Sequence, residues 1–198
     1  MTSFSAALEF LEAVPVKSVH LNGSTSTSQS DVSTVWSPPT DPFFKVNIDA
    51  SWDGSSNFGG IAAVVRDHLG SLVDGFAGVI HALSPLAAEL MAICEGLILI
   101  PKLPPGPITL ASDSLSLIKA FNSGVPPQDW TVSNLFFKAR YLSLNRQISW
   151  LWTSRKANRA ADHVAALAFR GLCPPSWVAH PPSSLVSILL YDGLPCPH

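Results

Sequence analysis

The segment FFKVNIDAS, residues 43–51, places an acidic residue inside a pattern that is typical of a buried strand. Aromatic and β-branched residues alternate with polar ones along it, which predicts a β-strand. Asp49 follows the apolar residues Val46 and Ile48 closely, and an acid is unexpected near the middle of a central strand. Asp49 is therefore the first candidate functional residue.

Hydrophobic periodicity on the C-terminal side of this segment predicts an alternation of strands and helices. Ser84 and Pro85 are suited to begin a helix that ends at Pro101, and Gly124 is suited to end the next one. The expected strands cover 43–51, 59–67, 71–80, 108–112 and 147–153, and the expected helices cover 84–100, 113–121, 130–145 and 157–169. The first three strands form an antiparallel meander, and the later crossovers imply a parallel portion. The predicted class is α/β, with one mixed five-stranded sheet and helices on both faces.

The composition of the chain divides it into three parts. Residues 1–42 are rich in serine, threonine and proline and are predicted to be a flexible leader or linker. Residues 43–170 hold all the predicted elements and form the expected domain. Residues 171–198 are proline-rich, and we expect this tail to lie on the surface or to be partly disordered.

Overall composition excludes several classes of protein. Hydrophobic residues make up 47% of the chain and charged residues 13%, so the chain as a whole is not of the disordered class. The longest apolar stretch, 86–100, contains two glutamates, which excludes a membrane span, and no signal peptide is evident. The cysteines have no zinc-ligand spacing and are odd in number; they are Cys94, Cys173 and Cys196. We expect an intracellular monomer, nuclear or cytoplasmic, with reduced thiols.

The distribution of charge is more informative than the net charge of −2. The segment from Lys138 to Arg170 contains seven lysines or arginines and a single acid, Asp162. A basic C-terminal half beside an acidic centre suits a protein that meets phosphates at one face. A solvated helix face would give the same pattern, so charge alone does not decide between the two.

Three further acids occupy positions where α/β folds bring side chains together. Glu89 falls in the first turns of the helix 84–100, Asp113 directly follows the strand 108–112, and Asp162 falls in the first turns of the helix 157–169. Four neighbouring carboxylates would repel one another unless cations neutralise them. Ligands that offer only oxygen suit Mg²⁺ or Mn²⁺, and two such ions about 3.5–4 Å apart can promote phosphodiester cleavage.

The chain resembles the type 1 ribonuclease H family, most closely the plant branch that is related to retroelement ribonuclease H domains. The resemblance covers about Lys45 to Phe169 and is carried by the segments KVNIDAS, GGIAAVVRDHLG, AAELMAICEGL, ASDS and RKANRAADHVAALA. It implies that two Mg²⁺ ions are bound by Asp49, Glu89, Asp113 and Asp162. It also implies cleavage of the RNA strand of an RNA–DNA hybrid, so the expected partner is nucleic acid.

The resemblance further implies contacts to nucleic acid around the four acids. The residues assigned to this role are Ala50, Ser51, Arg155, Lys156, Asn158 and Arg159. For the three basic residues, solvated charge and phosphate contact remain alternative interpretations. For Trp150 and Trp152, which share one face of a strand, core packing is favoured over base stacking.

The chain departs from the family pattern at two positions near the acids. Trp152 stands where the family commonly has a histidine, and Ala50 stands where it often has glycine. His163, which follows Asp162 on the helix, is interpreted as a surface or packing histidine. A catalytically silent nucleic-acid-binding or interaction module therefore stays open as the alternative function, with an exonuclease or transposase of related fold as a third class.

Overall fold

The computed structural model describes residues 35–144 and 146–193, which all belong to one compact unit, Val32–His198. Predictions that concern residues 1–34, residue 145 and residues 194–198, Cys196 among them, lie outside the described residues. The described cysteines, Cys94 and Cys173, form no disulfide. No helix in the described ranges is both long enough and apolar enough to cross a membrane.

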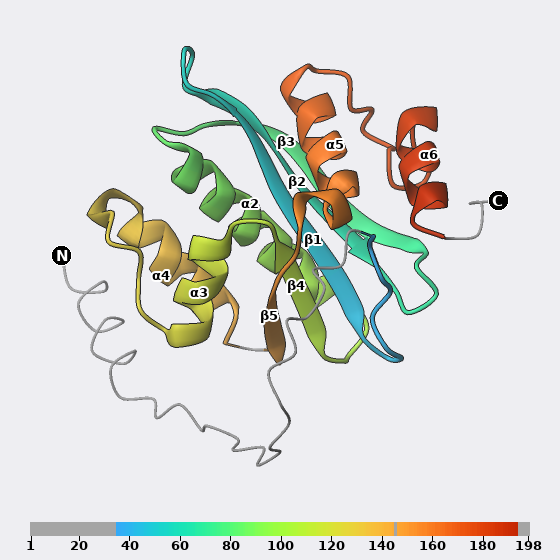
Figure 1. Ribbon diagram of the computed structural model, residues 1–198, viewed down its shortest axis with the longest axis horizontal. Helices are drawn as coiled ribbons and strands as arrows, with labels where there is room; N and C mark the ends of the chain where they lie inside the picture. The colour runs from blue at the N-terminus through green and yellow to red at the C-terminus, as the bar shows by residue number, and fades with distance from the viewer. Residues whose placement is uncertain (1–34, 145, 194–198) are drawn as a thin grey trace. The chain divides into compact units, whose positions relative to one another are not determined.

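A single mixed sheet of five strands, in the order β3-β2-β1-β4-β5, forms the centre of the unit (Figure 1). The first three strands pair antiparallel, whereas β1 with β4 and β4 with β5 pair parallel. Their bounds are Phe44–Asp53 for β1, Phe58–Arg66 for β2, Leu72–His81 for β3, Ile108–Ser112 for β4 and Ile148–Trp152 for β5. The predicted fold class is confirmed.

Helices cover both faces of the sheet, with α2, α3 and α4 on one side and α5 and α6 on the other (Figure 1). Their bounds are Pro85–Leu99 for α2, Leu115–Ser123 for α3, Ser133–Leu142 for α4, Arg159–Phe169 for α5 and Ser183–Tyr191 for α6. Short 3-10 turns occupy Ile100–Lys102, Trp130–Val132 and Arg155–Ala157. The predicted caps are confirmed, because Ser84 Oγ accepts from the amide of Ala87 and Gly124 ends α3 with a φ of 74°.

Side chains of β1 alternate between two separate cores. Val46 and Ile48 lie in the larger core, under α2, α3 and α4. Asn47 and Asp49 are also buried, and strand alternation directs them to the opposite face. The smaller core on that face is formed by Ala62 and Val64 of β2 together with α5 and α6. Asn47 and Asp49 therefore belong to the face of the sheet that α5 covers.

The proline-rich C-terminal segment departs from the expectation of a surface tail. Its residues 183–191 form α6, and Leu185 and Leu189 pack into the smaller core. Trp177 is buried against Gly75 of β3. The apolar side chains follow the prolines at i and i+4 spacing, which is the periodicity of a helix. The prolines around this segment make its short helical pattern hard to recognise from composition.

The segment just before β1 also departs from the expectation of a flexible linker. Trp36 is only 3% exposed, and its indole Nε1 donates to Asn47 Oδ1 over 2.8 Å. Lys45, a buried residue of β1, donates from Nζ to the carbonyl of Ser37. The described residues that precede β1 are therefore fixed to the face of the sheet that carries Asn47.

Close packing of α2 on β1 depends on Gly96. A methyl group at this position would collide with Cδ1 of Ile48, whereas Val46 and Ala63 would stay at ordinary contact distance. Because Ile48 precedes Asp49 and α2 carries Glu89, the Gly96–Ile48 contact sets how closely the two acid-bearing elements approach.

We predict that Gly96→Ala destabilises the protein by about 1–3 kcal/mol through overpacking. Ile48→Val removes the colliding methyl group and costs about 0.5–1.5 kcal/mol alone. In the Ile48→Val background, Gly96→Ala becomes neutral or stabilising, because alanine is favoured over glycine in a helix by about 1 kcal/mol. Urea unfolding of the two single variants and the double variant measures this coupling; strictly additive losses would contradict it.

Candidate metal centre

Three acids meet where the parallel strands β1 and β4 diverge. Ser112, the last residue of β4, pairs with Ile48, so Asp49 and Asp113 are the next residues on two adjacent parallel strands. Glu89 reaches the same point from the first turns of α2. One carboxylate oxygen from each of the three lies within 4.8 Å of the others. The carboxyl ends of parallel strands are where α/β folds place their sites.

Burial and mutual repulsion make ionisation of these acids unfavourable. Desolvation is the largest cause that raises the pKa of Asp49, to about 9, and the charges of Glu89, Asp113 and Asp162 raise it further. Desolvation also raises the pKa of Glu89 to about 8, with help from Asp113, although a hydrogen bond to the backbone of Ala50 opposes the rise. The positive charge of the neighbouring described residues is therefore too small to keep these acids ionised.

The donor set fits a hard divalent cation. Glu89 Oε2 is buried and has no hydrogen-bond partner among the described residues. A buried carboxylate oxygen without a hydrogen-bond partner destabilises the folded state. A cation that coordinates this oxygen would satisfy it, and a site of carboxylates alone favours Mg²⁺ or Mn²⁺ over zinc.

Asp162, the fourth predicted ligand, lies outside the group of three. It is exposed in the first turn of α5, yet it is close enough for its charge to raise the pKa of Asp49. The structure therefore brings together Asp49, Glu89 and Asp113 within ligand distance of one another and leaves Asp162 at the solvent edge of the same cluster.

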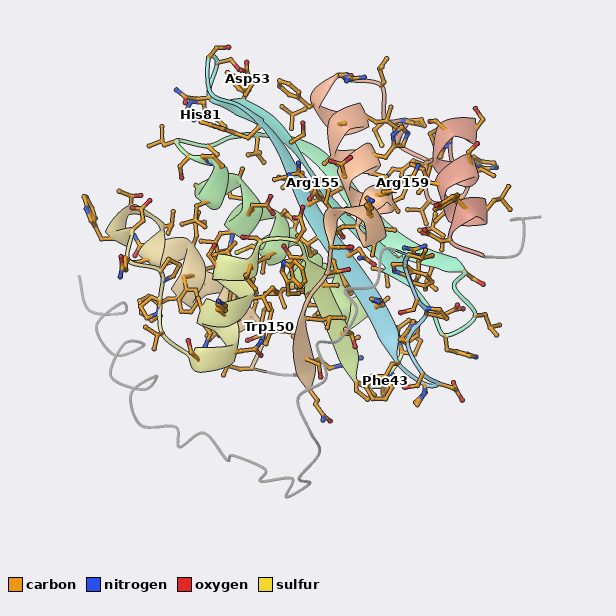
Figure 2. All side chains as sticks on the ribbon, in the orientation of Figure 1. Phe43, Asp53, His81, Trp150, Arg155 and Arg159 are labelled. Carbon is orange, nitrogen blue, oxygen red and sulfur yellow. The ribbon has the colours of Figure 1, made fainter. Side chains whose placement is uncertain are left out.

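Arg155 is the cation that the chain itself directs at the cluster. Its Nε lies 3.2 Å from Asp113 Oδ2, and its side chain is 83% exposed. Figure 2 shows Arg155 near the beginning of α5, where Arg159 is also labelled. An exposed ion pair of this kind contributes little stability, so the guanidinium is free to exchange Asp113 for another anion.

The remaining residues predicted to contact nucleic acid divide into two sets. Ser51 is half-buried on β1, and Lys156 and Arg159 are exposed. The guanidinium of Arg159 lies 4.9 Å from the ring centre of Tyr191, at the end of α6. Ala50 packs against the larger core and offers its backbone to Glu89, so its side chain faces protein.

Asn158 is a correction to the sequence-based assignment. The side chain is fully buried and donates from Nδ2 to the carbonyl of Ile48, at 2.9 Å, and to Asp49 Oδ1, at 3.2 Å. It accepts at Oδ1 from Asn47. A fully buried amide has no surface to offer a phosphate, so Asn158 holds Asp49 in place and does not contact a ligand.

The indole ring of Trp152 can only donate a hydrogen bond. Its Nε1 donates to the carbonyl of Asp113 over 3.0 Å, and an indole N–H has no lone pair with which to accept a proton. Trp152 therefore fixes the backbone of Asp113. Trp150 stacks on Phe121 with ring centres 4.0 Å apart, which confirms core packing for that residue.

His163 of α5 and Asp53 of the β1–β2 turn form their hydrogen bonds away from the three converged acids. His163 Nε2 lies 2.8 Å from Ser184 Oγ of α6, as a packing histidine would. Asp53 accepts from Ser55 and Ser56 in the β1–β2 turn, at the outer tip of the hairpin in Figure 2.

Sequence reasoning missed Asn47 as a residue that supports the site. Asn47 connects Trp36 to Asn158 and is fully buried. The available signal was an amide at a core position of β1, two residues before Asp49 on the same face. A buried amide requires partners, and neither partner adjoins it in sequence.

Comparison with known proteins gives one family and several structural relatives. The family model described as reverse transcriptase-like matches residues 47–168, and no curated protein matches the chain. The N-terminal RNase H domain of Rv2228c from Mycobacterium tuberculosis is 25% identical, with a TM-score of 0.57 over 66% of this chain and 95% of that one.

Two further solved structures share the fold at lower identity. RNase H1 from the archaeon Halobacterium salinarum is 21% identical, with a TM-score of 0.59 over 65% of this chain and 98% of that one. LC11-RNase H1, solved in complex with an RNA/DNA hybrid, is 20% identical, with a TM-score of 0.57 over 65% and 97%. With the fold and the acidic cluster described above, the family match identifies the chain as a member of the reverse transcriptase-like family, with the fold of type 1 ribonuclease H.

Proposed function

We propose that this protein is a metal-dependent endonuclease that hydrolyses the RNA strand of RNA–DNA hybrids. The observation that carries the proposal is the convergence of Asp49, Glu89 and Asp113, from three separate elements, within 4.8 Å. The raised pKa values of Asp49 and Glu89 support it, as does Glu89 Oε2, which has no hydrogen-bond partner among the described residues, because a bound cation would stabilise these carboxylates.

In this proposal the three converged acids, with Asp162 at the solvent edge, hold two Mg²⁺ or Mn²⁺ ions. When bound, the ions supply an activated water and neutralise charge on the leaving oxygen. Asn158 fixes one oxygen of Asp49, and Trp152 fixes the backbone of Asp113. These contacts hold two ligands in place before the ions bind, which is the role of outer-shell groups in metal sites.

The substrate class rests on the family and on the exposed cations beside the cluster. The relative LC11-RNase H1 was solved with an RNA/DNA hybrid. A hybrid is selected by its shape and by the 2′-hydroxyl of one strand. Arg155, Lys156 and Arg159 are exposed beside the site, where they would contact phosphates, and Ser51 lies on the strand that carries Asp49.

One observation favours a second candidate function, a catalytically silent nucleic-acid-binding module. The family resemblance expects a histidine at the position of Trp152, whose indole N–H neither ionises near neutral pH nor accepts a proton, so it cannot exchange one with a leaving group. A silent module would keep the fold and the basic residues without turnover. To distinguish the endonuclease from the silent module, metal binding must be measured together with hybrid cleavage.

We predict that Asp113→Asn abolishes Mg²⁺-dependent cleavage of labelled RNA in a hybrid and weakens Mn²⁺ binding by more than about tenfold, since the loss of an anionic ligand costs at least as much as the loss of a hydrogen-bond partner behind a ligand. Glu95→Gln, a change on the same helix as Glu89 and outside the group of three, is the control and retains both properties. Robust metal-dependent cleavage by Asp113→Asn would refute the proposed role of Asp113 in a metal-dependent endonuclease. Wild-type protein that binds Mn²⁺ without cleaving would favour the silent module.

We also predict that the metal-free protein loses stability as pH rises from about 6 to 9. The folded-state pKa values of Asp49 and Glu89, about 9 and about 8, lie above their ordinary values of 3.8 and 4.5. In this window the folded state binds more protons than the unfolded state, so stability falls with pH. Thermal unfolding in a chelator measures the trend, and Asp49→Asn flattens it. A pH-independent difference between wild type and Asp49→Asn would contradict the prediction.

We predict that Arg155→Ala separates metal binding from substrate binding. Loss of the guanidinium removes positive charge beside Asp113, so the Mn²⁺ dissociation constant falls about two- to fivefold. The change is modest because the Arg155 side chain is 83% exposed and water screens its charge. The KM for the hybrid rises, since a phosphate contact is lost. Titration calorimetry and steady-state kinetics provide both values. Arg170→Ala, at the other end of α5, leaves both unchanged; equal effects of the two substitutions would refute a specific role for Arg155.

A further inference from the structure

A continuous line of buried hydrogen bonds runs from Trp36 to Asp49. Trp36 Nε1 donates to Asn47 Oδ1 at 2.8 Å, and Asn47 Nδ2 donates to Asn158 Oδ1 at 2.9 Å. Asn158 Nδ2 then donates to Asp49 Oδ1 at 3.2 Å. Both amides are fully buried, so water has no access with which to replace a missing partner.

The two ends of this line determine its direction. The indole of Trp36 can only donate, and Asp49 Oδ1 accepts both in the carboxylate and in a carboxyl group that is protonated at Oδ2. Each asparagine between them has one acceptor and one donor group, so every bond is satisfied only when both amides face the same way. The carbonyl of Ile48, which accepts from Asn158, favours that same orientation. The orientation in which the Asn158 amide donates to Asp49 therefore depends on the indole N–H of Trp36, eleven residues before Asn47.

Trp36 in turn packs against Arg66 of β2, which forms a buried ion pair with Asp192. The guanidinium carbon of Arg66 lies 3.4 Å from the ring centre of Trp36, an arrangement that favours a cation over an aromatic face. Arg66 Nη1 lies 2.8 Å from Asp192 Oδ2, with side chains 1% and 3% exposed. Asp192 directly follows α6. Trp36 and Asp192, which lie on either side of the family match, thus both contact Arg66.

We propose that Trp36 is a positioning residue for Asp49, and that the Arg66–Asp192 pair holds Trp36 in place. The line of amides occupies Asp49 Oδ1 and leaves the other oxygen of this carboxylate for a cation. Residues outside the family match, 47–168, therefore complete the site. The functional consequence rests on the proposed metal-dependent activity, whereas the orientation of Asn158 does not.

The decisive experiment compares Trp36→Phe with Trp177→Phe in the full chain. Phenylalanine keeps a ring under Arg66 and removes the N–H, which leaves Asn47 Oδ1 without its donor. Trp177 is equally buried but packs against Gly75 in the smaller core, so its replacement controls for lost packing. The readouts are the side-chain amide NMR resonances of Asn158 in metal-free protein, the Mn²⁺ dissociation constant, and kcat and KM for the hybrid.

The expected result is specific to Trp36→Phe. The Asn158 amide resonances shift, Mn²⁺ binding weakens about tenfold, as for loss of an outer-shell partner, and kcat falls at unchanged KM when Mn²⁺ is held at a fixed subsaturating concentration. Trp177→Phe lowers stability without these changes. Asp192→Asn, which keeps shape and removes the charge, gives a smaller shift in the same direction and decides the matter if Trp36→Phe does not fold.

Two outcomes would overturn the inference. One is an Asn158 amide unchanged in Trp36→Phe, or in Asp192→Asn if that variant decides. The other is equal weakening of Mn²⁺ binding by Trp36→Phe and Trp177→Phe, which would assign the effect to stability. If the wild type binds no Mn²⁺, the proposed function fails, and the amide resonances still judge the role of Trp36.

Discussion

The candidate site is governed by the repulsion among three neighbouring carboxyl groups, which the basic side chains of the described residues do not fully neutralise. Asp49, Glu89 and Asp113 are held within 4.8 Å, and burial adds to their mutual repulsion, so the pKa values of Asp49 and Glu89 rise steeply. Arg155 compensates only from the solvent side. An arrangement that is unfavourable alone and favourable with a divalent cation is what a metal site requires.

The end of β4 and the close packing of α2 on β1 bring these acids together. β4 stops opposite Ile48, which opens the side of β1 at Asp49 to residues from both faces of the sheet. Gly96 lets α2 lie close enough for Glu89 to reach that opening. On the other face, the amides behind Asp49 fix its side chain and are themselves fixed by Trp36. Packing of the two cores opposes the electrostatic cost and keeps the acids together.

Most of the fold, and the places of the four acids on their strands and helices, could be predicted from sequence, because both depend on local signals. Strand alternation, the Ser84–Pro85 start and the glycine after α3 each act within a few residues. What could not be predicted depends on distant partners. The burial of Asn158, the anchoring of Trp36 and the packing of α6 all join segments far apart in sequence, and composition alone suggested mobile ends.

The most direct test of the metal centre is the anomalous scattering of Mn²⁺ in crystals of the wild-type protein. The account predicts anomalous peaks bounded by carboxylate oxygens of Asp49, Glu89 and Asp113, with the Glu89 oxygen that has no partner here among the ligands. Ligand distances of about 2.0–2.4 Å would be consistent with a hard cation bound to oxygen. Saturating Mn²⁺ that leaves this cluster empty, or that binds only elsewhere, would contradict it.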